Sequence, residues 1–161
     1  MEDTSVTALD SRDDCVSAVA KLVDAADLHI AMFTQRLEPL LYNHREICES
    51  ISRLARKNRH SRIRIIAQDT RSAAEGHCLM TLAQQLSSSI QIRVPASREL
   101  QRFEKSLLII DDHSMAVIDD PERYEGKLIE NNRLHIKTEL AFFDDAWENS
   151  LPDPNSRRLH I

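Results

Sequence analysis

Polar and apolar residues alternate along the chain in two rhythms, one typical of helices and one typical of strands. Ser11 or Asp13 can cap a helix that ends near Asp27. Its apolar side chains recur at three- and four-residue spacing: Val16, Val19, Leu22 and Val23. Residues 28–33 form a short apolar run, which predicts a buried strand directly after this helix.

The same succession of helix and strand occurs twice more. Asn43 is a predicted cap for the second helix, and residues 63–67 form the strand that follows. Asp69 or Thr70 opens a third helix. Its inward side chains are Leu79, Leu82, Ala83 and Leu86. Residues 90–94 alternate with period two and predict the third strand. Strands separated by helices indicate right-handed crossovers and parallel pairing.

The rhythm changes in the last third of the chain. Residues 106–110 and 114–118 are two apolar runs separated by three residues, and so short a link requires an antiparallel hairpin. A polar stretch follows, and then a final helical segment marked by Leu134, Ile136, Leu140, Phe143 and Trp147. The predicted fold class is therefore α/β, with a mixed, largely parallel sheet and helices on both faces.

Length and composition indicate one domain without a membrane span. The 161 residues, 42% of them hydrophobic, suffice for a single core, which we assign to residues 1–151. Residues 152–161 contain two prolines and are predicted to be a flexible tail. No apolar run approaches about 20 residues, and residues 1–14 lack the features of a signal peptide, so we expect a cytoplasmic protein.

Several classes of chemistry find no support in the sequence. Only two glycines, Gly76 and Gly126, are present, too few for a Walker loop or a dinucleotide-binding turn. Ser87–Ser89 lacks the glycines of a nucleophile elbow. The formal net charge of −5 does not favour a polyanionic ligand at long range. We therefore expect no cofactor.

The three cysteines, Cys15, Cys48 and Cys78, are far apart and contain no CxxC pair. This spacing argues against a disulfide framework and against a cysteine zinc site, so we expect buried, reduced thiols. His77 beside Cys78 lacks a third ligand at a suitable spacing. Four aspartates flank the predicted hairpin and are interpreted as turn residues: Asp111, Asp112, Asp119 and Asp120. No metal site is predicted.

A basic run lies at the end of the second predicted helix and the start of the second strand. The candidates for nucleic-acid binding in it are Arg56, Lys57, Arg59 and Arg62. The alternative interpretation is structural, because cations in a last helical turn complement the helix dipole and alternating arginines are typical of a solvent-facing strand. His29, within an apolar strand, is interpreted as a hydrogen-bonded core or barrel-edge residue rather than a catalytic one.

The order of these elements resembles one domain of the phospholipase D superfamily. The resemblance spans about residues 8–150 and includes the hairpin with its acidic turn and the terminal segment Phe142–Ser150. It is closest to an uncharacterised bacterial group of such domains, often found beside an N-acetyltransferase domain. Single-domain members of the superfamily pair two half-sites across a two-fold axis, so the resemblance implies a homodimer.

The superfamily's chemistry uses the motif HxKxxxxD, in which histidine attacks phosphorus and lysine binds phosphate oxygens. The corresponding stretch here runs from Arg102 to Asp111. Aligned on Lys105, the motif places Phe103 at the histidine position and Ile110 at the aspartate position. Aligned on Asp111, it places Glu104 at the histidine position. Both alignments lack the nucleophile, so Lys105 and Asp111 are remnants of the motif.

A second HxK sequence, His135 to Lys137, has Phe142 where the aspartate should fall. It lies in a predicted helix, where the two side chains point to different faces. We interpret these residues as surface polar groups.

The sequence therefore predicts a degenerate, non-catalytic phospholipase D-like module with a binding or interaction role. Residual phosphate binding is assigned to Lys105, Arg93 and Arg98, near the carboxyl ends of the strands. One alternative is a phosphodiesterase or nuclease with a displaced site, in which His113, His135 or a second subunit supplies the histidine. Another is a weak nucleic-acid-binding module. The expected partners are a second copy of the chain and, from the resemblance, an acetyltransferase.

Overall fold

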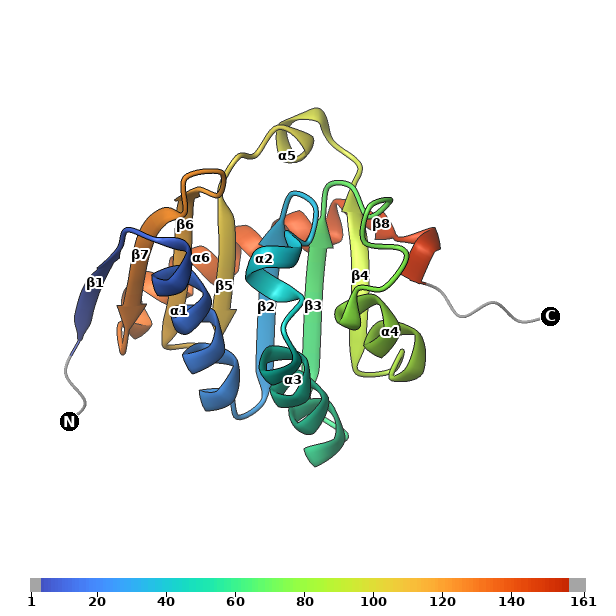
Figure 1. The fold of residues 1–161 in the computed structure, drawn as a ribbon, viewed down its shortest axis with the longest axis horizontal. Coiled ribbons are helices and arrows are strands. Elements are labelled where there is room, and N and C mark those ends of the chain that lie inside the picture. The colour runs from blue at the N-terminus through green and yellow to red at the C-terminus, as the bar shows by residue number, and fades with distance from the viewer. Residues whose placement is uncertain (1–3, 157–161) are drawn as a thin grey trace.

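One eight-stranded sheet runs through the molecule in the order β1-β7-β6-β5-β2-β3-β4-β8 (Figure 1). The computed structural model describes residues 4–156. The strands are β1 (Ser5–Leu9), β2 (His29–Thr34), β3 (Arg62–Ala67), β4 (Ile90–Pro95), β5 (Ser106–Ile110), β6 (Ser114–Asp120), β7 (Glu125–Glu130) and β8 (Ser150–Pro152). The helices are α1 (Arg12–Ala25), α2 (Pro39–Tyr42), α3 (Arg45–Lys57), α4 (Cys78–Gln85), α5 (Arg98–Gln101) and α6 (Arg133–Glu148), with a 3-10 helix at Pro154–Ser156.

The sheet is mixed, as predicted, but it is not largely parallel. Only the pairs β2·β3 and β3·β4 are parallel in the described chain, and the other five neighbouring pairs are antiparallel. The crossovers through α3 and α4 produce the parallel strands. The prediction is wrong because β5 enters antiparallel to β2, and because β1, β7 and β8, which the apolar pattern did not reveal, all add antiparallel edges.

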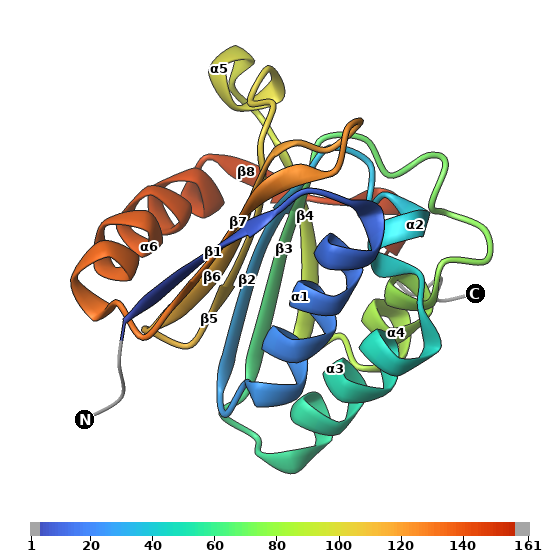
Figure 2. The ribbon, with the colours of Figure 1, turned by 60° about the vertical axis from the view of Figure 1, so that its left-hand side comes forward.

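Helices cover both faces of the sheet, as the sequence predicts (Figure 2). α1 to α4 lie on one face over a core that includes Val19, Ile51 and Ile65, and α6 lies on the other over Phe33 and Ile109. The short α5 lies beyond one end of the sheet.

Local capping explains where the longest helices begin. The Ser11 hydroxyl accepts a hydrogen bond from the Asp14 amide at the start of α1, which confirms the predicted cap. The Asn132 side chain does the same for the His135 amide in α6. Asn43 does not cap α3, because its side-chain oxygen accepts from the Cys78 amide instead.

The third predicted helix begins at Cys78 rather than near Thr70. Residues 68–77 form an irregular loop in which the Thr70 hydroxyl donates to Asp153 and Gly76 adopts a φ of +80°. Helix α4 then starts behind His77, whose ring nitrogen accepts from the Leu79 amide.

The chain after α6 returns to the sheet. Ser150–Pro152 pairs with β4, and Asp153 is only 1% exposed. Residues 152–156, at the start of the predicted tail, therefore pack on the fold. Residues 157–161 of that predicted tail lie outside the described residues.

Two of the three cysteines differ from the prediction. Cys48 of α3 and Cys78 of α4 form a disulfide, whereas Cys15 is free and buried. The sequence separation of 30 residues gave no signal for this pairing, which arises because α3 and α4 pack side by side.

Candidate functional site

A cavity of about 820 Å³ opens at the end of the sheet where β2, β3 and β6 finish. Open α/β sheets usually bind ligands at the carboxyl ends of parallel strands, so this cavity is the candidate site. Four segments far apart in the sequence line it. Their lining residues are Gln35, Arg36, Glu38, Pro39 and Leu40; Gln68 and Ser72; Gln101, Arg102, Phe103 and Glu104; and Asp119, Asp120, Pro121, Glu122 and Tyr124.

Two glutamines hold the segment that enters β5. Gln35 Nε2 donates to the Phe103 carbonyl at 3.1 Å and to the Lys105 carbonyl at 2.8 Å. Gln68 Nε2 donates to the Leu100 carbonyl at 2.9 Å and to the Phe103 carbonyl at 2.6 Å. The sequence analysis missed both residues. The available signal was their position, since each directly follows a buried parallel strand.

A buried hydroxyl chain lies beneath the cavity wall. Ser106 Oγ donates to the Phe33 carbonyl at 3.2 Å. Because its one hydrogen is used there, Ser106 Oγ accepts the hydrogen bond from Tyr42 OH at 2.6 Å. Burial raises the pKa of the Tyr42 hydroxyl above its usual range, and the nearby Glu38 carboxylate raises it further. Tyr42 therefore stays protonated at neutral pH and contributes structure rather than acid–base chemistry.

Phe103 occupies the histidine position of the motif when the motif is aligned on Lys105. Its ring centroid lies 4.9 Å from that of Phe33 and 5.3 Å from that of Phe142. Such edge and tilted contacts stabilise an aromatic cluster. In the other alignment the position belongs to Glu104, which is exposed and lines the cavity. Phe103 cannot attack phosphorus, and a carboxylate at this position would repel a phosphodiester.

Lys105 forms an ion pair with a carboxylate, so its ammonium group is not free to bind an anion. Its Nζ lies 3.4 Å from the Asp119 carboxylate, and both side chains are about half-exposed. Lys105 is not among the residues that line the cavity, whereas Asp119 is. A phosphate would have to compete with this carboxylate for the ammonium group.

Asp111, the other remnant, lies at the opposite end of β5. Its carboxylate accepts hydrogen bonds from the amides of Asp27, Leu28 and His29 at 2.8 to 2.9 Å. The five residues of β5 span about 17 Å, so Lys105 and Asp111 do not share a site. Asp111 joins the α1–β2 turn to the hairpin.

The structure also separates the predicted phosphate ligands. Arg93, on β4, donates to the Trp147 carbonyl at 2.8 Å, and its guanidinium lies 4.2 Å from the centroid of the Trp147 ring. This places Arg93 beneath α6, three strands and about 14 Å from β5 and Lys105. Arg98 lies exposed on α5. These three cations do not converge.

The charge of the cavity opposes phosphate binding as well. Two cationic residues line it, Arg36 and Arg102. Five acidic residues line it: Glu38, Glu104, Asp119, Asp120 and Glu122. An excess of carboxylates around a concave surface repels a phosphodiester before any contact forms.

Within residues 4–156, no histidine lines the cavity. His113 lies in the turn after β5, at the Asp111 end, and its carbonyl accepts from the Asn132 amide at the start of α6. His135, in the first turn of α6, is therefore also at that end. His29 is exposed at the start of β2, so of the two structural alternatives the core position is ruled out.

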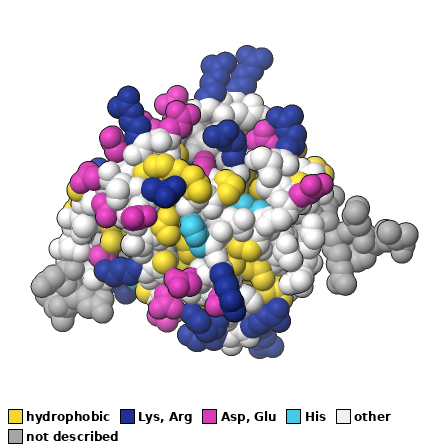
Figure 3. Space-filling view, in the orientation of Figure 1, with side chains coloured by type: hydrophobic (Ala, Val, Ile, Leu, Met, Phe, Trp, Pro, Cys, Tyr) yellow, Lys and Arg dark blue, Asp and Glu magenta, His cyan; other side chains and the backbone are white. Residues whose placement is uncertain are grey.

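The basic run lies at the end of the sheet opposite the cavity. Arg56, Lys57, Arg59 and Arg62 are all exposed there. Figure 3 shows Lys and Arg side chains gathered along the lower edge of the face that α1 to α4 cover. Lys57 lies 3.9 Å from Asp27, a distant and exposed ion pair.

In residues 4–156, no group of three or more His, Cys, Asp or Glu side chains could hold a metal ion. None of the helices described is long and apolar enough to span a membrane.

Solved structures with the same fold include members of the phospholipase D family. Nuc from Salmonella typhimurium, a phospholipase D family member, has a TM-score of 0.66 and 16% identity, over 94% of this chain and 99% of that one. NucT from Helicobacter pylori has a TM-score of 0.65 and 11% identity, over 94% and 99% of the two chains. The archaeal chromatin protein TrmBL2 has a TM-score of 0.68 and 12% identity, over 94% of this chain and 54% of that one.

At these identities the likeness establishes the fold alone, and the fold is phospholipase D-like. No curated protein sequence matches the chain. One family model matches residues 11–159, nearly the whole chain. The chain belongs to the family described as a domain of unknown function, DUF7931.

Proposed function

We propose that this protein is a non-catalytic phospholipase D-like module that binds or positions a partner. The observation that carries the proposal is the packing of Phe103, the residue at the histidine position when the motif is aligned on Lys105, between Phe33 and Phe142. These aromatic contacts support a structural role for Phe103 in the segment that leads into β5. The fold is retained while the covalent step has no nucleophile.

The electrostatics around Phe103 support the same proposal. Lys105 is paired with Asp119, and the cavity carries five acidic residues against two arginines. Stabilising a transferring phosphoryl group requires positive charge aimed at its oxygens. The arrangement here suits a neutral or cationic partner group better than a phosphodiester.

The first experiment measures hydrolysis of bis-p-nitrophenyl phosphate by the purified protein across a pH range that brackets histidine titration. Lys105→Ala is compared with the wild type, and Lys127→Ala, an exposed lysine on β7, is the matched control. We expect no turnover above the buffer rate in any of the three. Circular dichroism confirms that each variant is folded.

A turnover that disappears in Lys105→Ala but survives in Lys127→Ala would contradict the proposal. It would support the displaced-site phosphodiesterase or nuclease instead. His113 and His135 lie at the far end of β5 from Lys105, so of the three sources named in the sequence analysis a second subunit would be the one left.

The expected setting of the module is a cytoplasmic homodimer or a complex with an acetyltransferase, as the resemblance to a phospholipase D-like group implies. Residues 4–156 present an open cavity whose rim includes the exposed Leu40, and such a surface can receive a protein segment. Sedimentation of the protein alone, and then with a candidate acetyltransferase, tests both partners.

A second candidate function is weak nucleic-acid binding through the basic end of the sheet. Arg56, Lys57, Arg59 and Arg62 are exposed together there, in a fold shared with a chromatin protein whose structure shows a novel mode of DNA binding. Exposed cations bind phosphates without base readout, and such binding weakens steeply with salt.

Fluorescence anisotropy with a short DNA duplex tests this second candidate at about 50 mM and about 200 mM salt. Arg59→Ala with Arg62→Ala should weaken binding and reduce its salt dependence, while the matched control Arg98→Ala, at the opposite end of the sheet, should not. Binding that is absent at low salt, or unaffected by the double change, would rule this candidate out.

A further inference from the structure

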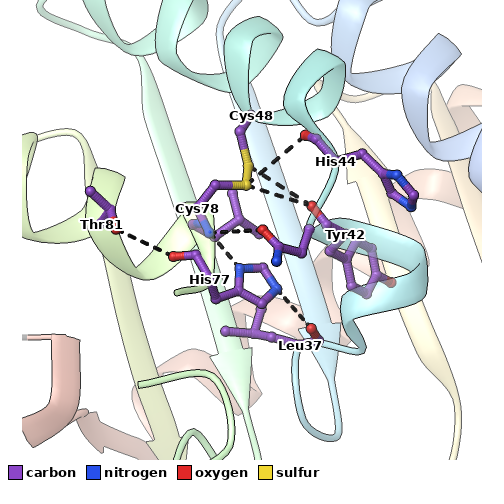
Figure 4. The surroundings of a disulfide bond; sticks show 9 residues. Leu37, Tyr42, His44, Cys48, His77, Cys78 and Thr81 are labelled. Carbon is purple, nitrogen blue, oxygen red and sulfur yellow. Dashed lines mark hydrogen bonds between the residues drawn. A yellow bond between two sulfur atoms is a disulfide. The ribbon is translucent and has the colours of Figure 1, made fainter. Parts of the chain in front are cut away.

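A disulfide joins the two helices that follow the loops of the cavity wall (Figure 4). Cys48 lies in the first turns of α3, and Cys78 is the first residue of α4. Cys48 is 6% exposed, whereas Cys78 is partly exposed. Cys78 is therefore the more accessible residue of the pair.

Two hydrogen bonds beside the disulfide connect the same two loops. His77 Nε2 donates to the Leu37 carbonyl at 2.8 Å, and the Cys78 amide donates to Asn43 Oδ1 at 3.0 Å (Figure 4). The cavity residues Glu38, Pro39 and Leu40 lie between the Leu37 and Asn43 anchors.

The second loop, residues 68–77, carries Gln68 and Ser72 of the cavity lining and ends directly at Cys78. It has no helix or strand of its own, and Arg71 and residues 74–76 are exposed. The buried Thr70 and Ala73 hold the first half of the loop, so it is the exposed second half that depends on the anchor at Cys78 for order. Its anchor at the α4 end is the disulfide with the His77 and Cys78 hydrogen bonds around it.

We propose that Cys48 and Cys78 are a reversible redox switch: the disulfide fixes the 68–77 loop in the cavity wall, and the dithiol releases it. In reduction, the thiolate of a small thiol attacks Cys78 Sγ, the Cys48–Cys78 bond breaks, and Cys48 leaves as a thiolate that takes up a proton. A second thiol then attacks the mixed disulfide. The sum converts the protein disulfide and two small thiols into two protein thiols and one small-molecule disulfide.

This inference is independent of the proposed function, because it concerns the order of the cavity wall and not what the cavity binds. A structural disulfide that never turned over would be expected in an oxidising compartment. In a reducing compartment the same pair would cycle with the small-thiol pool, and the shape of the cavity would follow it.

The test is limited trypsin digestion of the native protein, oxidised with glutathione disulfide or reduced with dithiothreitol, with cleavage after Arg71 followed by mass spectrometry. We expect reduction to speed this cleavage by about tenfold, because local opening of the loop controls access. The double variant Cys48→Ser with Cys78→Ser should be cut at the fast rate under both conditions. The matched control Cys15→Ser, which keeps the pair, should respond as the wild type does.

Hydrogen exchange on the same samples separates a local release from general loosening. Amides of residues 35–44 and 68–81 should exchange faster after reduction, while those of β5 and β6 should not. Three alkylatable thiols after treatment with glutathione disulfide would overturn the proposal. So would equal cleavage rates in the two forms, or an equal rise of exchange in β5 and β6.

Discussion

Lys105 and Asp111, the two residues on which the motif can be aligned, flank the two ends of β5, and their side chains differ in how many partners they have. At one end, the Asp111 carboxylate accepts three backbone amides and its side chain is 14% exposed. At the other, Lys105 is 53% exposed and has one carboxylate partner at 3.4 Å. The Asp111 carboxylate is part of the fold, and we expect that the Lys105 side chain can be removed without disturbing the fold.

This difference separates a side chain that the fold needs from one that only a ligand would need. A carboxylate that satisfies backbone amides is needed whether or not a substrate binds, because unpaired amides cost free energy in every molecule. A lysine that binds phosphate oxygens is needed only while phosphate is bound. The Asp111 carboxylate is thus needed by the fold itself, whereas Lys105 makes a surface ion pair.

The largest expected loss of stability comes from changing Asp111. Asp111→Ala removes the acceptor of three amides, and we expect it to lower the free energy of unfolding by about 3 kcal/mol. Urea denaturation measures this change. Asp111→Asn, which keeps one acceptor oxygen and tolerates the φ of +51°, should lose roughly half as much. A loss below about 1 kcal/mol for the alanine variant would show that water replaces the carboxylate.

The next largest loss of stability is expected from changing Gln68, which lines the cavity. Gln68→Ala removes two donors from the Leu100 and Phe103 carbonyls, and we expect a loss of about 2 kcal/mol in urea denaturation. Gln101→Ala is the control, because it removes a single bond, to the Pro95 carbonyl, from an exposed residue. Equal effects of the two changes would mean that Gln68 does not hold the entry to β5.

The sequence revealed the elements with local signals and missed those that depend on distant partners. The Ser11 cap and the three-residue link of the β5–β6 hairpin are local features, and both were predicted. β7 was missed because charged residues such as Lys127 interrupt its apolar pattern, and its pairing with β1 joins segments over 100 residues apart. Residue patterns alone do not record such pairings.

The site was predictable only in part for the same reason. The loss of the histidine can be read directly from Phe103 and Glu104. The role of Asp111 cannot be read from the sequence, because the amides that donate hydrogen bonds to it lie more than 80 residues earlier in the chain. The disulfide was missed because only the packing of α3 against α4 brings its two cysteines together.

A smaller, pH-dependent effect is expected in the cavity wall. The His77 ring accepts the Leu79 amide through Nδ1 and donates to Leu37 through Nε2, so a second proton on the ring removes the cap of α4. Burial lowers the pKa of His77 from its ordinary value of 6.5. The unfolded chain therefore takes up the proton first, and the stability from this cap, present above pH 6.5, declines as the pH falls below it.

The measurement is the urea midpoint between pH 7.5 and pH 5, with His77→Asn as the non-titrating cap and His77→Ala as the uncapped variant. We expect the alanine variant to lose about 1 kcal/mol at pH 7.5. The asparagine variant should show a shallower pH dependence than the wild type. Identical pH profiles for the wild type and His77→Asn would assign the dependence to other groups.

The smallest change in stability is expected at the Lys105 end of β5, and it tests directly whether the two ends differ. Lys105→Ala breaks a half-exposed ion pair with Asp119, and we expect a change of at most about 0.5 kcal/mol in the free energy of unfolding. Asp119→Ala should do as little, and the double variant should show almost no coupling between the two sites. A loss as large as that of Asp111→Ala would mean that Lys105 is also maintained by folding, and the contrast between the two ends of β5 would disappear.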